Sequence, residues 1–130
     1  MIDHISVNVS DPAASKAFYE AALAPLGYRV VMEFGPVTGL GAPVPGAPDD
    51  APVPPELWLS PTKSPTPCHI AVAAASTAQV DAFHEAALAA GGADNGAPGE
   101  RPHYHPGYYG AFVHDPDGNN LEAVFHGAGD

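Results

Sequence analysis

Residues 4–27 read HISVNVSDPAASKAFYEAALAPLG, and residues 69–92 read HIAVAAASTAQVDAFHEAALAAGG. At a constant offset of 65 the two segments agree at 12 of 24 positions without a gap, and each begins with a histidine. Similarity at a fixed internal spacing indicates a duplicated structural unit. We therefore expect a single domain over residues 1–130 that is built from two copies of one module, residues 1–61 and residues 67–127.

Each copy predicts a strand followed by a helix. Residues 4–9 alternate polar and apolar side chains, which is the period of a strand with one packed face. The first helix is expected to be capped by Ser10 or Asp11, and the second by Ser76 or Thr77. In both copies the leading histidine falls on the strand face that points away from the helix.

The remainder of each copy predicts further strands. In the first copy, residues 27–34 and 56–60 are apolar enough to form strands, whereas residues 35–55 are rich in Pro and Gly. This segment predicts an exposed loop in which VTGLG could form an edge strand. In the second copy, the turn sequence DPDGN between two apolar runs predicts a hairpin. The fold class is therefore α+β, with two tandem βαβββ modules.

Composition excludes several classes of partner. Fifteen acidic residues against four basic ones give a formal net charge of −11, the wrong sign for a nucleic-acid backbone. No apolar run approaches the length of about 20 residues that spans a bilayer. The only cysteine is Cys68, so no disulfide forms within the chain, and we expect a cytoplasmic location.

Three residues are candidate metal ligands. Glu122 lies between Leu121 and Ala123 in a strand that should be buried, where an ionised acid needs a partner or a metal. If the copies pair about a pseudo-twofold axis, His4 and His69 face each other and Glu122 reaches the same centre. Two imidazoles and one carboxylate suit Fe(II), and also Mn, Ni or Zn. Alternatively, the three form an internal hydrogen-bond cluster that supports Glu122.

The segment RPHYHPGYY, residues 101–109, is expected beside that centre. Its histidines could act as acid or base, and its tyrosines could polarise a substrate oxygen. The candidate catalytic residues are His103, His105 and Tyr109, and the candidate substrate-binding residues are Trp58, Phe34, Tyr104, Tyr108 and Arg101. The aromatic residues predict a pocket for a neutral, planar or carbonyl-bearing molecule, although they would equally suit core packing or a dimer contact.

The stretches DHISVNVSDPAASKAFYEAAL, CHIAV and AFVHDPDGNNLEAVFH resemble the vicinal oxygen chelate superfamily. This superfamily includes glyoxalase I, the fosfomycin and bleomycin resistance proteins, and the type I extradiol dioxygenases. The resemblance implies paired βαβββ modules that curl around a metal held by His4, His69 and Glu122. A fourth family ligand position falls, with a one-residue slip, on Trp58, which cannot bind a metal. The pattern is thus more similar to three-ligand members than to glyoxalase I.

The resemblance implies a small metal-dependent enzyme of the glyoxalase/dioxygenase type, either a lyase or isomerase or a dioxygenase. Its substrate would be a small, neutral or aromatic, oxygen-chelating molecule, and its cofactor a divalent metal ion. The alternative is a non-catalytic protein that sequesters a small molecule, as bleomycin resistance proteins do. Because exposed sheet edges are commonly covered by pairing, we expect a homodimer.

Overall fold

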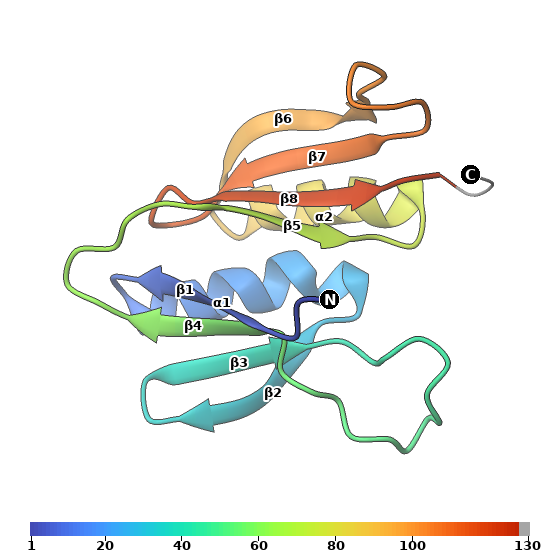
Figure 1. The fold of residues 1–130 in the computed structure, drawn as a ribbon. Coiled ribbons are helices and arrows are strands. Elements are labelled where there is room, and N and C mark those ends of the chain that lie inside the picture. The colour runs from blue at the N-terminus through green and yellow to red at the C-terminus, as the bar shows by residue number, and fades with distance from the viewer. Residues whose placement is uncertain (128–130) are drawn as a thin grey trace.

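The computed structural model describes residues 1–127, so the last three residues of the predicted domain lie outside the described range. Its elements follow the duplicated order that the sequence predicts (Figure 1). The first module contains β1 (Ile5–Val9), α1 (Pro12–Leu23), the 3-10 helix η1 (Ala24–Leu26), β2 (Arg29–Phe34), β3 (Val37–Gly41) and β4 (Leu57–Pro61). The second contains β5 (His69–Ala73), α2 (Thr77–Ala89), β6 (Ala93–Glu100), β7 (Tyr109–His114) and β8 (Asn120–Phe125).

Side-chain caps start both main helices. The Asp11 side chain accepts a hydrogen bond from the amide of Ala14, and the Ser76 side chain accepts one from the amide of Gln79. Each bond satisfies an amide that has no partner inside its helix. The predicted caps therefore set where α1 and α2 begin. No helix of the described residues is long and apolar enough to cross a membrane.

Each module forms its own mixed sheet, in the orders β1-β4-β3-β2 and β5-β8-β7-β6. In each sheet the first strand pairs in parallel with the last, and Ser6 lies opposite Trp58 as Ala71 lies opposite Glu122. Because Ser6 and Ala71 are equivalent at the offset of 65, the register makes Trp58 the counterpart of Glu122. The one-residue slip in the alignment is therefore real.

Two strands differ from the sequence prediction. The segment VTGLG, expected at an edge, is β3 and lies between β4 and β2, so it is an interior strand. Gly39 makes this position possible, because a Cβ there would lie 2.9 Å from the Trp58 ring. The sequence did not predict the position of β6, the second strand of module two, because its residues ADNGAPGE show no strand pattern. It pairs with β7 through a register that shifts twice.

Both helices pack on the same side of the two sheets and contact each other (Figure 1). The core lies in this layer, and its largest fully buried side chains include Tyr19, Leu23, Leu40, Leu59, Val80, Phe83, Val113 and Leu121. The opposite face of each sheet has no helix over it. We call this helix-free face of each sheet the open face.

The DPDGN turn also joins the two modules. Its Asp115 is buried and accepts hydrogen bonds from the Tyr19 hydroxyl at 2.6 Å and from the Asn119 side chain at 2.7 Å. Asp117 accepts a bond from the Ser10 hydroxyl at 2.5 Å. Tyr19 and Ser10 belong to module one, so the turn of module two fixes how the modules sit together. Sequence reasoning had assigned this segment to turn formation alone.

Candidate functional site

Glu122 is the centre of a hydrogen-bonded group on the open face of module two. Its residue is only 2% exposed. One carboxylate oxygen, Oε1, lies 2.9 Å from Nε2 of His69, and the other, Oε2, accepts a hydrogen bond from the Tyr108 hydroxyl. Gly110 leaves room for this contact, because a Cβ there would lie 3.3 Å from Oε2 and 3.2 Å from the Tyr108 ring. Both oxygens of this buried acid are therefore partnered.

Tyr108 is held as a protonated donor. Desolvation raises the pKa of its hydroxyl, and the hydrogen bond to the Glu122 carboxylate raises it further. A phenol with a raised pKa keeps its proton at neutral pH. The single hydroxyl proton of Tyr108 is donated to Glu122 in this structure, and it can pass to another nearby oxygen only when that bond is released.

His69 connects this group to solvent. Its side chain is 49% exposed, and its second ring nitrogen, Nδ1, lies 2.8 Å from Nδ2 of Asn120. The ring meets Phe112 edge-on, with centroids 6.2 Å apart. Its position at the start of β5, beside the buried carboxylate on β8, follows from the parallel pairing of these strands.

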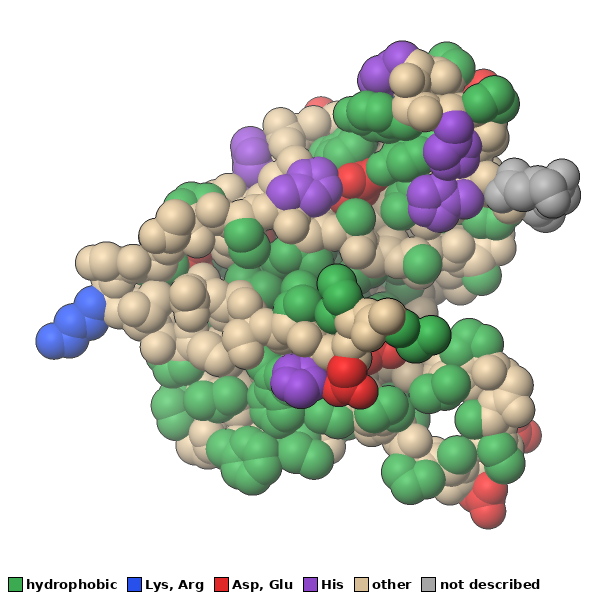
Figure 2. All heavy atoms as spheres, viewed as in Figure 1, with side chains coloured by type: hydrophobic (Ala, Val, Ile, Leu, Met, Phe, Trp, Pro, Cys, Tyr) green, Lys and Arg blue, Asp and Glu red, His purple; other side chains and the backbone are tan. Residues whose placement is uncertain are grey.

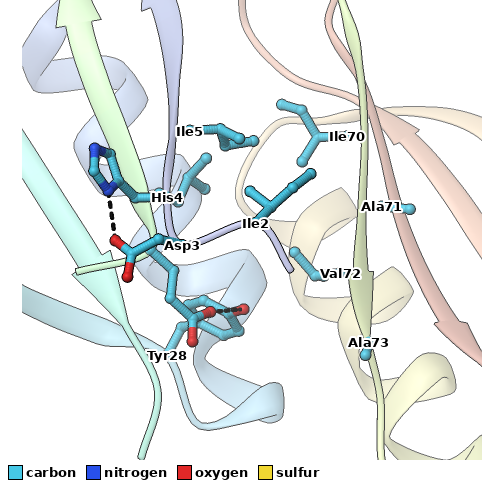
Figure 3. Close-up of a pocket in the computed structure, with 11 residues that line it drawn as sticks. Ile2, Asp3, His4, Ile5, Tyr28, Ile70, Ala71, Val72 and Ala73 are labelled. Atoms are coloured by element: carbon cyan, nitrogen blue, oxygen red, sulfur yellow. Dashed lines mark hydrogen bonds and ion pairs between the residues drawn. The ribbon is translucent and has the colours of Figure 1, made fainter. Parts of the chain in front are cut away.

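His4 does not join this pair within one chain. Its Nδ1 lies 2.6 Å from an Asp3 carboxylate oxygen, and its ring is directed away from β5 (Figure 3). The expected convergence on one centre fails because β1 and β5 run in opposite directions (Figure 1), so their starting residues stand at opposite ends. Residues 1–127 contain no group of three His, Cys, Asp or Glu side chains placed to hold a metal.

The predicted aromatic pocket is likewise divided between the modules. On module one, Phe34 stacks on Trp58 with ring centroids 5.9 Å apart. These two rings line a shallow open hollow together with His4. Phe34 is 62% exposed, which is high for a large apolar residue. No helix covers this face of the sheet.

On module two, the predicted loop residues form a ring cluster around Tyr108. Tyr104 lies 4.8 Å and His105 5.3 Å from the Tyr108 ring, measured between centroids, and the tilted ring of His103 lies 4.3 Å from that of Tyr104. His126, which sequence reasoning left without a role, lies 2.9 Å from His105 between ring nitrogens. Figure 2 shows histidines gathered over this half of the open face.

Two predicted site residues, Tyr109 and Arg101, make their hydrogen bonds outside the group around Glu122. The Tyr109 hydroxyl donates to Asp81 on α2 at 2.6 Å, on the helix side of the sheet, whereas Tyr108, the residue before β7, bonds to Glu122 on the open face. Arg101 donates to the backbone oxygens of Ala97 and Gly99, each at 2.8 Å. Its guanidinium is therefore bonded to carbonyls of β6 and lies over the Phe112 ring, 5.5 Å from the ring centroid. Tyr109, in contrast, lies on the wrong side of the sheet for catalysis beside Glu122.

A separate cavity of about 340 Å³ lies between the modules, where residues 2–5 pass β5 (Figure 3). Ile5 and Ile70 point toward each other across it. Tyr28 donates to Glu56 at 2.7 Å on its wall, and burial raises the pKa of the Tyr28 hydroxyl. The loop between β3 and β4 extends away from both sheets (Figure 1).

Comparison with known proteins agrees with this architecture. Residues 1–123 match the model of the Glyoxalase/Bleomycin resistance protein/Dioxygenase superfamily. A search of the curated proteins found no match.

Several solved structures have a similar fold. A glyoxalase/bleomycin resistance protein from Albidiferax ferrireducens is 29% identical, with a TM-score of 0.73 over 94% of this chain and 95% of that one. A family enzyme from Burkholderia phytofirmans is 19% identical, with a TM-score of 0.67 over 95% of this chain and 97% of that one. A glyoxalase I mutant from Zea mays is 23% identical, with a TM-score of 0.68 over 95% of this chain and 46% of that one. The latter two, at these identities, show a shared fold. Because the family model covers nearly the whole chain, this protein belongs to the Glyoxalase/Bleomycin resistance protein/Dioxygenase superfamily.

Proposed function

We propose that the protein is a metal-dependent enzyme acting on a small, neutral or aromatic substrate that offers two oxygens. The observation that carries the proposal is Glu122, a carboxylate that is 2% exposed and lies 2.9 Å from an imidazole nitrogen of His69. A buried acid with no Lys or Arg partner is costly unless it serves a purpose such as holding a cation. One imidazole and one carboxylate on an accessible face fit a divalent ion, Fe, Mn, Ni or Zn.

The third proposed ligand, His4, comes from a second copy of the chain. Both His4 and the His69–Glu122 pair lie on the open face, but at separate places within one chain. The open face of module one also exposes Phe34 beside Trp58, and a sheet normally buries its apolar face against another layer. In a homodimer with twofold symmetry, a contact made once is made twice. Two shared sites would therefore form, each completed by the partner's His4.

When bound, the ion supplies Lewis-acid stabilisation of negative charge that develops on a chelated oxygen. The chain's own groups then have separate roles. Tyr108 donates a hydrogen bond to a substrate oxygen, and the rings of Tyr104 and Tyr108 contact its planar part. His105 transfers a proton, a role better supported than the same role for His103, because its ring packs on Tyr108 rather than on Tyr104. We place the enzyme in the cytoplasm, because the chain has a single cysteine.

Elemental analysis after incubation with Fe(II), Mn(II), Ni(II) or Zn(II) tests this proposal. We expect close to one ion per chain in the parent and loss of the ion in Glu122→Gln. The matched control is Glu56→Gln, which removes the charge of a carboxylate that accepts from a tyrosine elsewhere. Equal metal content in Glu122→Gln and in the parent would overturn the assignment.

A second candidate function is sequestration of a small molecule without catalysis. It is favoured by the cavity of about 340 Å³ between the modules, which lies within the size range of ligand pockets, and by the absence of a three-ligand group within residues 1–127 of one chain. In this case the hydrogen bonds of His69 and Tyr108 simply support Glu122. The parent would then bind none of the four metals, and its stability would not respond to chelators.

A further inference from the structure

Asn120 is hydrogen-bonded to Nδ1 of His69, the ring nitrogen that does not face Glu122. The contact between His69 and Glu122 determines which group of the Asn120 amide faces Nδ1. A carboxylate accepts hydrogen bonds, so the His69 nitrogen that faces Oε1 at 2.9 Å, Nε2, carries the ring proton. In a neutral imidazole the other nitrogen, Nδ1, must then accept. Asn120 matches this requirement, because its NH2 group, Nδ2, lies 2.8 Å from Nδ1.

A second amide keeps Asn120 in this orientation. The Nδ2 of Asn95 donates to Oδ1 of Asn120 at 3.2 Å, which leaves the Asn120 NH2 group for the histidine. Asn95 reaches this position from an irregularity in β6. Asp94 pairs with Val113 and Gly96 pairs with Phe112, while Asn95 between them has no partner on β7. Such a bulge redirects a side chain that regular pairing would have placed elsewhere.

Binding of an ion would reverse the hydrogen-bonding need of His69. Nε2 faces Glu122 and is therefore the nitrogen that an ion shared with this carboxylate would use. To bind it, Nε2 must give up its proton, and the neutral ring then carries the proton on Nδ1. Nδ1 becomes a donor and needs an acceptor. An asparagine can supply either a donor or an acceptor, because turning its amide over exchanges Oδ1 and Nδ2. The Asn95 amide would turn with it, so that its oxygen accepts from the Asn120 NH2 group.

We propose that Asn120 is the positioning residue of His69, donating to Nδ1 in the metal-free chain and accepting from it when Nε2 binds the ion. The ion-bound half of this inference rests on the proposed function. The metal-free half rests only on the contacts among Asn95, Asn120, His69 and Glu122. Leucine has a similar size but supplies neither hydrogen bond, and aspartate supplies only the accepting one.

Nitrogen-15 NMR of the metal-free, full-length protein tests the first half. We expect the His69 proton on Nε2, facing Oε1 of Glu122, and a slowly exchanging Hε2 signal. Asn120→Leu should lose that slow exchange, because the ring is no longer held from behind. Asn8→Leu, an exposed asparagine on β1 with no side-chain partner among the described residues, is the control and should keep it. A proton found on Nδ1, or an Hε2 signal unchanged in Asn120→Leu, would overturn the inference whether or not the protein binds metal.

Zinc titration tests the second half without any measurement of activity. We expect the affinity of Asn120→Leu to fall by about 10- to 100-fold, the usual effect of removing a partner of a ligating histidine. Asn120→Asp should bind zinc at least about as tightly as the parent. In the zinc-loaded parent the His69 proton should be on Nδ1. Parental affinity in Asn120→Leu would refute the reversal. If the parent itself binds none of the metals, the proposed function fails together with the ion-bound half, and the metal-free NMR result alone decides the other half.

Discussion

Tyr19→Phe is predicted to weaken the contact between the two modules. The Tyr19 hydroxyl donates to Asp115 at 2.6 Å, and the tyrosine is fully buried. Burial is the main cause of its raised pKa, with the nearby Asp115 carboxylate as the second cause. A hydrogen bond to a charged group contributes about 1.5–3 kcal/mol. Because Asp115 keeps its bonds from Asn119, we expect a loss near the middle of this range, about 2 kcal/mol.

Urea unfolding of the purified protein measures this loss as a lower midpoint with an unchanged slope. In a thermal scan the same loss lowers the Tm by about 5–10 °C for a chain of this size. Tyr109→Phe is the matched control, because its hydroxyl donates to Asp81 on the protein surface at the same distance of 2.6 Å. Its expected cost is at most about 0.5 kcal/mol. If the two variants lose equal stability, the Tyr19–Asp115 bond does not hold the modules together.

Three further predictions follow from burial. Gly92→Ala should cost about 1–3 kcal/mol in urea unfolding, because a Cβ there would lie 2.5 Å from Val113 and 2.8 Å from Phe18; a variant as stable as the parent would show that this corner is loosely packed. In an alkaline absorbance titration, Tyr108 should ionise above the ordinary tyrosine range because its folded pKa is raised. Tyr108→Phe should therefore remove one late-titrating phenol, and loss of a phenol near pH 10 instead would contradict its burial against Glu122. A tyrosine whose pKa is higher in the folded than in the unfolded state contributes its full stabilisation below the unfolded pKa, and this contribution is lost as pH rises above that value. The stability of the parent should therefore fall as pH rises above about 10.

The duplicated order of elements was predictable from the sequence, because local patterns determine it. Strand alternation, the caps Asp11 and Ser76, and the hairpin around DPDGN are all written in neighbouring residues. Counting at the offset of 65 pairs Glu122 with Leu57, so the correspondence with Trp58 requires the one-residue slip that the strand register confirms. The fold class was therefore confirmed.

The arrangement of the site was less predictable, because it depends on how the two modules meet. The sequence shows that His4 and His69 are equivalent positions. It does not show that their strands run in opposite directions, which separates the two side chains. Nor does it reveal that Asp115 bonds to Tyr19, which lies 96 positions away in the chain. Strand alternation could have separated Tyr108 from Tyr109, since adjacent residues of a strand never share a face. The role of Asn95 was hidden because a bulge has no simple sequence pattern.

We propose that each metal site combines His69 and Glu122 of one chain with His4 of a second. Mixing His4→Ala chains with Glu122→Gln chains, by unfolding and refolding them together, tests it directly. Neither variant alone should bind the metal that the parent binds. A mixed dimer would regain one intact site, built from the unaltered His4 of one chain and the unaltered Glu122 of the other, so an equal mixture should recover about a quarter of the parental metal content. No recovery in dimers that demonstrably contain both variants would contradict the shared site.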